Sequence, residues 1–253
     1  MRYSPADHGQ AFVSALQFLT TLPVTQSDPP DERVQGLSLL WYPAIGLLLG
    51  TLLCLAAGWL QGPYALTAAL LLAIWAGLTG ALHLDGLADC ADAWVGGMGG
   101  REKTLALLKD PTCGVMAVVV IVVVLLLKWV SLTVLLETRS LVWLVLPAFF
   151  ARLSVYALFL RLPYVREAGI GAVLASHFPA NAAKTLLVIT GLALAVVLPL
   201  GAFLALSVAV CAVVWWVCRA SRRRLGGFTG DVAGAQIELV EVTVLLTLAF
   251  LLS

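Results

Sequence analysis

Three aspartates, Asp85, Asp89 and Asp92, lie close together in the stretch HLDGLADCAD at residues 83–92. Positions i, i+4 and i+7 share one face of a helix, so the three carboxylates would form an acidic stripe. No basic residue follows before Arg101, and like charges at this spacing repel one another. A bound cation is the simplest stabiliser, and oxygen ligands favour Mg²⁺, Ca²⁺ or Mn²⁺ over zinc or copper. The stripe therefore predicts a divalent-cation site.

Two residues flank this stripe as further candidates. Asp110 lies in the same polar connector, residues 85–113, and is a fourth carboxylate for the ion. A lone histidine at the end of a membrane span is more often a hydrogen-bonded residue than a catalyst, so a base role for His83 is the minor alternative. Each acid taken singly also has a structural explanation, since Asp85 or Asp231 can cap a helix N-terminus.

A second group of acids lies in the C-terminal stretch GGFTGDVAGAQIELVE. Asp231 stands at the entrance of an apolar segment, with Glu238 two turns later and Glu241 close to the same face. Glutamates inside a span are costly when they face lipid, so we expect these two to face a cavity or a partner. Lys128 and Arg152, which also lie within apolar segments, are the candidate partners. A simple pairing of Glu238 with Arg152 is the structural alternative to a role in a site.

The composition indicates which elements position these residues. Of the 253 residues, 61% are hydrophobic and 11% are charged, and the mean hydropathy is +1.01. A soluble domain is nearer half apolar and a quarter charged, so the chain is expected to be an all-α polytopic integral membrane protein. The net charge of +1 gives no support to nucleic-acid binding. The five cysteines form no CxxC pair and are interpreted as free thiols in a reducing compartment.

Apolar stretches of about 20 residues, long enough to cross a bilayer, recur along the chain. Residues 185–218 are too long for one helix, and the break Leu198-Pro199-Leu200-Gly201 divides them into two. We therefore expect about seven transmembrane helices in a single membrane-embedded catalytic domain, residues 1–253. The remaining five spans are expected near residues 37–60, 63–84, 114–136, 140–160 and 232–252.

Basic residues are divided unequally between the two sides that these spans create. Arg139 alone falls on one side. Twelve fall on the other: Arg2, Arg33, Arg101, Lys103, Lys109, Arg161, Arg166, Lys184, Arg219, Arg222, Arg223 and Arg224. The positive-inside rule places the second side, which also holds the acidic connector, in the cytoplasm. The C-terminus is then expected outside.

Residues 9–24, GQAFVSALQFLTTLPV, are too polar for a span. Four polar residues recur in them at helical spacing: Gln10, Ser14, Gln17 and Thr21. This pattern is typical of an amphipathic helix that lies at the membrane interface. The equal alternative is a helix packed beside the bundle, whose polar stripe serves its neighbours.

An ordered set of motifs covers nearly the whole chain and resembles one family, cobalamin synthase, the adenosylcobinamide-GDP ribazoletransferases. The motifs are FLTTLPV at 18–24, WYPAIGLLLG at 41–50, HLDGLADCAD at 83–92, KDPTCG at 109–114, YVREAGIG at 164–171 and GGFTGDVAGAQIELVE at 226–241. The resemblance implies a Mg²⁺-dependent enzyme of the bacterial cytoplasmic (inner) membrane, with its active site facing the cytoplasm. It would join adenosylcobinamide-GDP to α-ribazole or its 5′-phosphate and release GMP.

The resemblance also implies roles for particular residues. The family pattern H-x-D-G-L-A-D-x-x-D matches His83, Asp85, Gly86, Asp89 and Asp92, and T-G-D-x-x-G-A-x-x-E-x-x-E matches Thr229, Gly230, Asp231, Gly234, Glu238 and Glu241. Expected metal ligands are Asp85, Asp89, Asp92 and Asp110. Expected catalytic residues are Asp92 or Asp231 as base, with His83 in reserve. Expected substrate-binding residues are Lys109, Arg152, Arg166, Thr229, Glu238 and Glu241.

Two other functions compete with this interpretation. A CDP-alcohol phosphotransferase would share the chemistry, but its D-G-x-x-A-R signature is absent, since Cys90 follows Ala88-Asp89. A cation or proton transporter could use Glu238, Glu241, Lys128 and Arg152 as an intramembrane relay. However, the richest acid cluster lies at one end of the spans and not at the midplane, where transporters usually bind. A homo-oligomer or a complex with other enzymes of cobalamin synthesis is compatible with the resemblance.

Overall fold

The computed structural model describes residues 3–26, 30–98 and 100–252, and these residues are almost entirely helical. Within them the only pairing of extended backbone is one bridge between Tyr164 and Phe228. The helices are α1 Pro5–Leu19, α2 Glu32–Ser38, α3 Tyr42–Trp59, α4 Tyr64–Thr79, α5 Leu82–Gly96, α6 Arg101–Leu107, α7 Val115–Glu137, α8 Val145–Arg161, α9 Ile170–Ser176, α10 Ala180–Val197, α11 Leu200–Leu225 and α12 Gly230–Leu252. The predicted all-α class is confirmed.

Six helical stretches among the described residues are long and apolar enough to cross a membrane. They are Glu32–Trp59, Val115–Glu137, Leu141–Arg161, Ala180–Val197, Leu200–Leu225 and Gly230–Leu252. Helices α4 and α5 add a seventh span only if they are counted together, because the chain bends by 90° between them. The chain is therefore a multi-pass membrane protein, as its composition predicts.

The bend between α4 and α5 differs from the single span expected over residues 63–84. Gly80 and Ala81 both adopt left-handed backbone conformations, with φ of 60° and 54°. Such a conformation ends α4, and glycine adopts it without steric cost. Thr21 satisfies the carbonyl groups left free there, since its backbone N–H donates to Leu78 O (2.8 Å) and its hydroxyl to Gly77 O (2.9 Å). The acidic stripe therefore lies on a separate short helix that turns away from α4.

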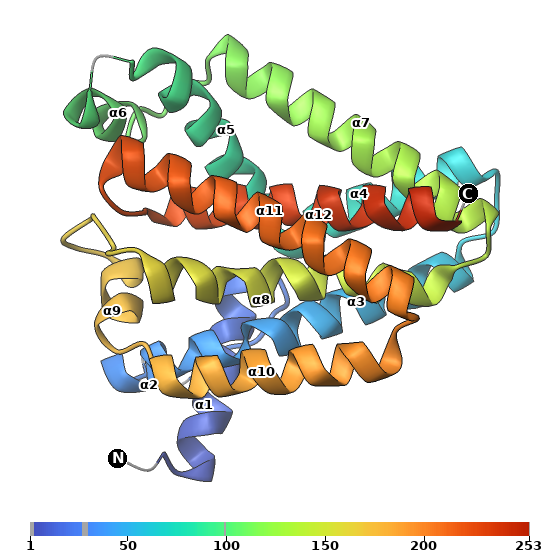
Figure 1. Cartoon of the computed structure of the whole chain (residues 1–253), viewed down its shortest axis with the longest axis horizontal. Helices are drawn as coiled ribbons and strands as arrows, with labels where there is room; N and C mark the ends of the chain where they lie inside the picture. The colour runs from blue at the N-terminus through green and yellow to red at the C-terminus, as the bar shows by residue number, and fades with distance from the viewer. Residues whose placement is uncertain (1–2, 27–29, 99, 253) are drawn as a thin grey trace.

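The connections sort onto two ends of the bundle (Figure 1). The α3–α4, α7–α8 and α10–α11 connections and the C-terminus lie on the right in this view, whereas α6, α9 and the α11–α12 connection lie on the left. We call the left end the basic end, because α6, the α8–α9 connection and the last turns of α11 carry Arg101, Lys103, Arg161, Arg166, Arg219, Arg222, Arg223 and Arg224. The predicted division of basic residues is confirmed for these positions. Arg2 lies outside the described residues.

Helices α8 and α12 form the centre of the bundle, with α3 against α8 and with α5, α7 and α11 around α12. Glycines permit the closest approaches. A Cβ added to Gly50 of α3 would lie 2.5 Å from Val145 Cα, and one added to Gly86 of α5 would lie 2.8 Å from Asp231 O. Small residues at such crossings let helices pack tightly inside a membrane. Gly86 thus fixes α5 directly against the start of α12, where the two acid groups of the sequence meet.

Helix α1 runs across the bundle and packs on α2 and α3 (Figure 1). Ala11, Ala15 and Leu19 are buried against the neighbouring helices. The side chain of Gln17, on the polar stripe, donates to Val24 O (2.7 Å), and the backbone carbonyl of Gln10 accepts from the Gln26 side chain (2.7 Å). Helix α1 thus packs beside the bundle and ends at Leu19, so Thr21 of the expected polar stripe follows the helix. A position of this helix at the membrane interface stays a prediction.

Candidate active site

A cavity of about 180 Å³ lies where α1, α3, α5, α8, α9 and α12 meet. Its polar lining comes from α5, from the start of α12 and from the segment that follows α8. The lining residues include Tyr42, His83, Asp85, Gly86, Tyr164, Phe228, Asp231 and Gly234. The first acid of the stripe and the first acid of the C-terminal group thus share one cavity, as the sequence analysis expected of two clusters on the same side.

Asp85 and Asp89 are open carboxylates on α5. Asp85 is exposed and Asp89 is half-buried. Within the described residues, neither side chain makes a hydrogen bond or a salt bridge. Partial burial, together with the negative charges of Asp85 and Asp231, raises the pKa of Asp89 to about 6. This stripe is therefore poorly compensated by the protein, which is the property that a bound cation would correct.

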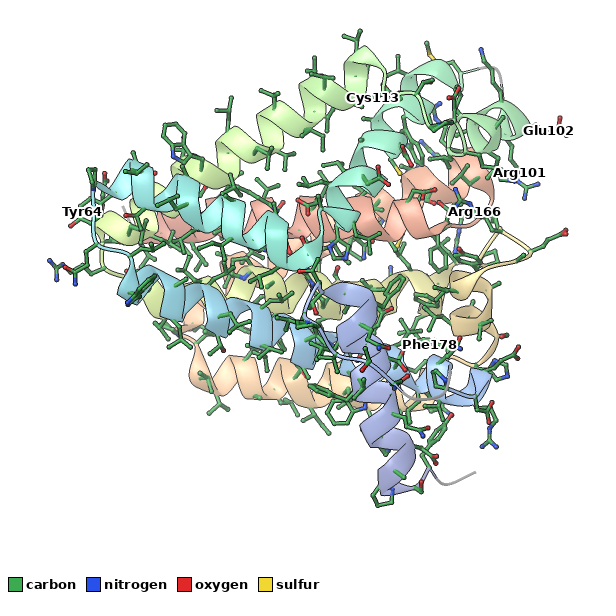
Figure 2. All side chains as sticks on the ribbon, turned by 180° about the vertical axis from the view of Figure 1, so that it is seen from behind. Tyr64, Arg101, Glu102, Cys113, Arg166 and Phe178 are labelled. Carbon is green, nitrogen blue, oxygen red and sulfur yellow. The ribbon has the colours of Figure 1, made fainter. Side chains whose placement is uncertain are left out.

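Arg166 brings a positive charge close to these acids. Its Nη2 donates to Asp231 Oδ2 (2.6 Å) and to Leu108 O (3.0 Å), and Thr229 Oγ1 donates to the same Asp231 oxygen (3.1 Å). The Nε of Arg166 is buried without a hydrogen-bond partner in the described part of the chain. Figure 2 shows the Arg166 side chain at the basic end, where the α8–α9 connection approaches α12. An arginine with an unused donor beside open carboxylates suits a ligand that carries negative charge.

A short backbone pairing fixes the position of Arg166. Val165 N donates to Phe228 O (3.0 Å), and Phe228 N donates to Pro163 O (3.0 Å). Gly227 is required at this contact, because a Cβ there would collide with Pro163 O. The segment before α12 and the segment after α8 are thereby tied together, which holds Arg166 next to Asp231.

Asp92, Asp110 and Lys109 lie apart from this group. Both oxygens of Asp92 accept from the backbone at the start of α7, from Gly114 N (2.6 Å) and Ala117 N (2.9 Å). Asp110 lies on the surface and accepts from the backbone and hydroxyl of Thr112, and these hydrogen bonds lower the pKa of Asp110. Lys109 is exposed. Within the described residues, no three acidic, histidine or cysteine side chains converge closely enough to hold an ion unaided. The metal and substrate roles of Asp92, Asp110 and Lys109 stay predictions.

The remaining expected residues form a second group, which we call the interior charge cluster: Lys128, Arg152, Glu238 and Glu241. The ammonium of Lys128 lies 2.6 Å from Glu238 Oε2 and 2.5 Å from Glu241 Oε2, and Arg152 pairs with Glu241. None of the four is more than 4% exposed. The expectation that the glutamates face Lys128 and Arg152 is confirmed, although Glu238 pairs with Lys128 instead of Arg152.

His83 connects the two groups. It lines the cavity, and its Nδ1 lies 3.5 Å from Arg152 Nη2. The His83 Nε2 is buried and has no hydrogen-bond partner in the described residues. The sequence placed His83 at the end of a span, whereas the bend after α4 places it inside the bundle. The roles of Arg152, Glu238 and Glu241 toward a substrate stay predictions, with their charged groups engaged with one another.

Three aromatic residues of the cavity, Tyr42, Tyr164 and Phe228, escaped the sequence analysis as site residues. Tyr42 and Tyr164 bring hydroxyl groups, and Phe228 lies edge-on to Tyr164 with ring centroids 5.3 Å apart. In a chain so rich in apolar residues, the spacing of single aromatic residues does not distinguish those of a site from those of the core. The only available indication was that all three fall inside the quoted motifs or directly beside the acid Asp231.

Comparison with known proteins extends over nearly the whole chain. The family model described as cobalamin-5-phosphate synthase matches residues 11–249. An adenosylcobinamide-GDP ribazoletransferase of Pseudomonas entomophila (strain L48) is 50% identical over 95% of this chain and 98% of its own length. Proteins of the same description from Pseudomonas putida (strain W619) and Stutzerimonas stutzeri (strain A1501) are each 51% identical over 94% and 93% of this chain, and 98% and 96% of their own. No solved structure matches.

Proposed function

Because the chain belongs to the cobalamin-5-phosphate synthase family, we propose that it joins adenosylcobinamide-GDP to α-ribazole or α-ribazole 5′-phosphate. The reaction releases GMP and belongs to the last steps of cobalamin biosynthesis. The observation that carries this proposal is the match of about 95% of the chain, at 50–51% identity, to relatives bearing that activity in their name. The geometry adds that Asp85 and Asp231 line one cavity, with Asp89 one turn further along α5 and Arg166 hydrogen-bonded to Asp231, an arrangement that suits a diphosphate substrate.

Asp85 in the cavity lining and Asp89 one turn further along α5 form a donor set that fits Mg²⁺. The ion typically takes one or two protein carboxylates and completes its shell with water and substrate phosphates. Asp85 and Asp89 supply two oxygen ligands on adjacent turns of α5, and neither has another partner among the described residues. Asp85 and Asp89 would therefore hold the ion. When bound, Mg²⁺ would neutralise the charge of the diphosphate as its bridging bond breaks.

Arg166 is the residue best placed to bind phosphate. Its guanidinium carries a permanent charge and presents donors in a planar fork that matches phosphate oxygens. The Nε is buried and free, and the Nη2 is shared with Asp231. The side chain is 29% exposed, so a phosphate would bind its accessible part and not the buried Nε.

The transfer itself is a displacement at phosphorus. The 3′-hydroxyl oxygen of the ribazole bonds to the phosphorus on the cobinamide side, and the bridging oxygen leaves with GMP. Asp231 is the better placed base for the hydroxyl proton, because it lines the cavity, whereas both oxygens of Asp92 serve the start of α7. His83 lines the same cavity and is the reserve candidate.

We also propose that the basic end faces the cytoplasm of a bacterial inner membrane. Nine of the expected cytoplasmic basic residues are at this end or in the connectors beside it: Arg101, Lys103, Lys109, Arg161, Arg166, Arg219, Arg222, Arg223 and Arg224. An excess of Lys and Arg in short connectors marks the cytoplasmic side of a membrane protein. The cavity opens near this end, so soluble nucleotide substrates would reach it from the cytoplasm.

One assay tests the proposed reaction. Purified full-length protein in detergent or vesicles is mixed with adenosylcobinamide-GDP, α-ribazole and Mg²⁺, and cobalamin and GMP are measured in equal amounts. EDTA should stop the reaction, and excess Mg²⁺ should restore it. Glu167→Gln, which changes an exposed acid beside Arg166, serves as the active control. Absence of both products with folded protein and either form of ribazole would refute the proposal.

A further inference from the structure

A second hollow, larger than the site cavity, opens on the outer surface of the bundle. It has a volume of about 360 Å³ and lies between α5, α7, α11 and α12. Its lining is almost entirely apolar, with the thiol of Cys90 and the indole N–H groups of Trp94 and Trp216 as exceptions, and also includes Met116 and Leu239. We call it the lipid groove. Trp216 is 53% exposed and Val95 is 46% exposed, so the groove is not covered by the chain itself.

The lipid groove lies directly behind the candidate active site. On α5, the groove residues Leu87, Cys90, Ala91 and Trp94 occupy the face opposite the acidic stripe. On α12, Val232 and Ala235 line the groove, whereas Asp231 lines the site cavity. Helix α5, which carries the open carboxylates, and the start of α12 thus form the wall between the two hollows.

Positive charge collects at the rim of this groove. Arg223 and Arg224 follow Ala220, a groove residue, by three and four positions, and therefore share its face of α11. The Nη1 of Arg224 donates to the carbonyl of Trp94 (2.9 Å), which places its guanidinium at the end of the groove. Within the described residues, no arginine of the last turns of α11 makes a salt bridge. The rim is therefore strongly positive and uncompensated.

From this combination we propose that the lipid groove binds one anionic phospholipid. The acyl chain would lie along Trp94, Met116 and Trp216, and the phosphate would meet Arg223 and Arg224 at the basic end. Tryptophans at the headgroup level and basic residues next to them are typical of the membrane interface. An anionic headgroup near such a cluster gains attraction from each arginine, whereas a zwitterionic lipid carries no net charge to attract. The binding site does not depend on the reaction proposed above.

Lipid retention measures this site directly. Full-length protein is equilibrated with vesicles of equal parts phosphatidylglycerol and phosphatidylcholine, extracted gently, and examined by native mass spectrometry. The wild type should retain one phosphatidylglycerol in preference to phosphatidylcholine. Arg224→Gln should lower that preference by about fivefold, the effect of one basic residue at a membrane surface. Arg139→Gln is the matched control, because this exposed arginine lies in the α7–α8 connection, at the opposite end of the bundle.

Filling the groove gives an independent second variant. Ala220→Trp places a large side chain in the groove and should remove the retained lipid, whereas Val208→Trp adds the same side chain to an exposed position of α11 outside it. Loss of lipid in Ala220→Trp alone supports the site. Equal retention of both lipids by the wild type, or unchanged retention in both Arg224→Gln and Ala220→Trp, would overturn it.

Discussion

The interior charge cluster and the open carboxylates of α5 both contain acidic side chains, but only the cluster supplies basic partners for them. In the cluster, two acids and two bases are buried and face one another within hydrogen-bond distance. On α5, Asp85 and Asp89 have no partner among the described residues, and the nearest basic group, Arg166, is engaged with Asp231. The positive and negative charges of the cluster balance one another, whereas no positive charge of the described residues pairs with Asp85 or Asp89.

This difference distinguishes a structural role from a ligand-binding role, although both groups look alike as charged residues within an apolar sequence. A fully paired cluster inside a membrane holds helices α7, α8 and α12 in register and offers little to a ligand. An uncompensated pair at a cavity needs a counter-charge from outside the chain. We therefore expect substitutions on α5 to affect activity and substitutions in the cluster to affect stability.

The largest effect is expected from the open carboxylates. Asp85→Asn and Asp89→Asn should each lower the rate of GMP release by about a thousandfold or more, because metal stabilisation of transition-state charge is worth several kcal/mol. Thermal unfolding in detergent should stay near that of the wild type, since neither carboxylate bonds to the protein. Rates near those of the wild type in both variants would remove these residues from the metal site.

The next largest effect is expected on stability, from a substitution in the interior charge cluster. Glu241→Gln leaves Lys128 and Arg152 short of one negative charge, and loss of one partner from a buried ion pair costs about 3–5 kcal/mol. In a chain of this size the unfolding temperature should fall by about 10 °C. Glu137→Gln, at an exposed acid at the far end of α7, is the matched control. A fully stable Glu241→Gln protein that has lost activity would reverse the assignment of the two groups.

Arg166 should show an intermediate effect on substrate use. Arg166→Gln removes charged hydrogen bonds to phosphate and should lower kcat/KM by about 10- to 100-fold. Arg166→Lys keeps the charge without the planar fork, so it should recover part of the loss. Steady-state kinetics with varied adenosylcobinamide-GDP checks this. An equal loss for Lys and Gln would show that the charge contributes little at this position.

The smallest effect is expected at Asp110. This residue is exposed, and its carboxylate accepts from Thr112 within its own turn. Asp110→Asn should therefore change the rate by no more than about twofold, since exposed charges are strongly screened. A loss comparable to that of Asp85→Asn would instead show that the surface turn joins the metal site when substrate binds.

Much of the architecture could be predicted from the sequence because apolar length and charge asymmetry act along the chain. The spans, the basic end and the pairing of the buried glutamates with Lys128 all follow from such local patterns. The bend at Gly80 and Ala81 could not be predicted from local patterns. It depends on Thr21, a residue far away in the sequence, which donates hydrogen bonds to the last backbone carbonyls of α4.

The acidic residues of the site could be predicted from the sequence, but the positions and orientations of their side chains could not. Periodicity placed Asp85, Asp89 and Asp92 on one face, yet Asp92 points its carboxylate at the start of α7. The orientation of this carboxylate depends on the path of the connector between α6 and α7, and the spacing of residues in the sequence does not reveal that path. The same holds for Arg166, whose position depends on the backbone pairing of Val165 with Phe228.

Mn²⁺ binding, followed by electron paramagnetic resonance with adenosylcobinamide-GDP present, tests the contrast between the two groups most directly. The wild type and Glu238→Gln should each bind one catalytic ion per chain, and Asp85→Asn combined with Asp89→Asn should bind none at this site. Unchanged Mn²⁺ binding in that double variant, or its loss in folded Glu238→Gln protein, would contradict the assignment of the ion to the open carboxylates.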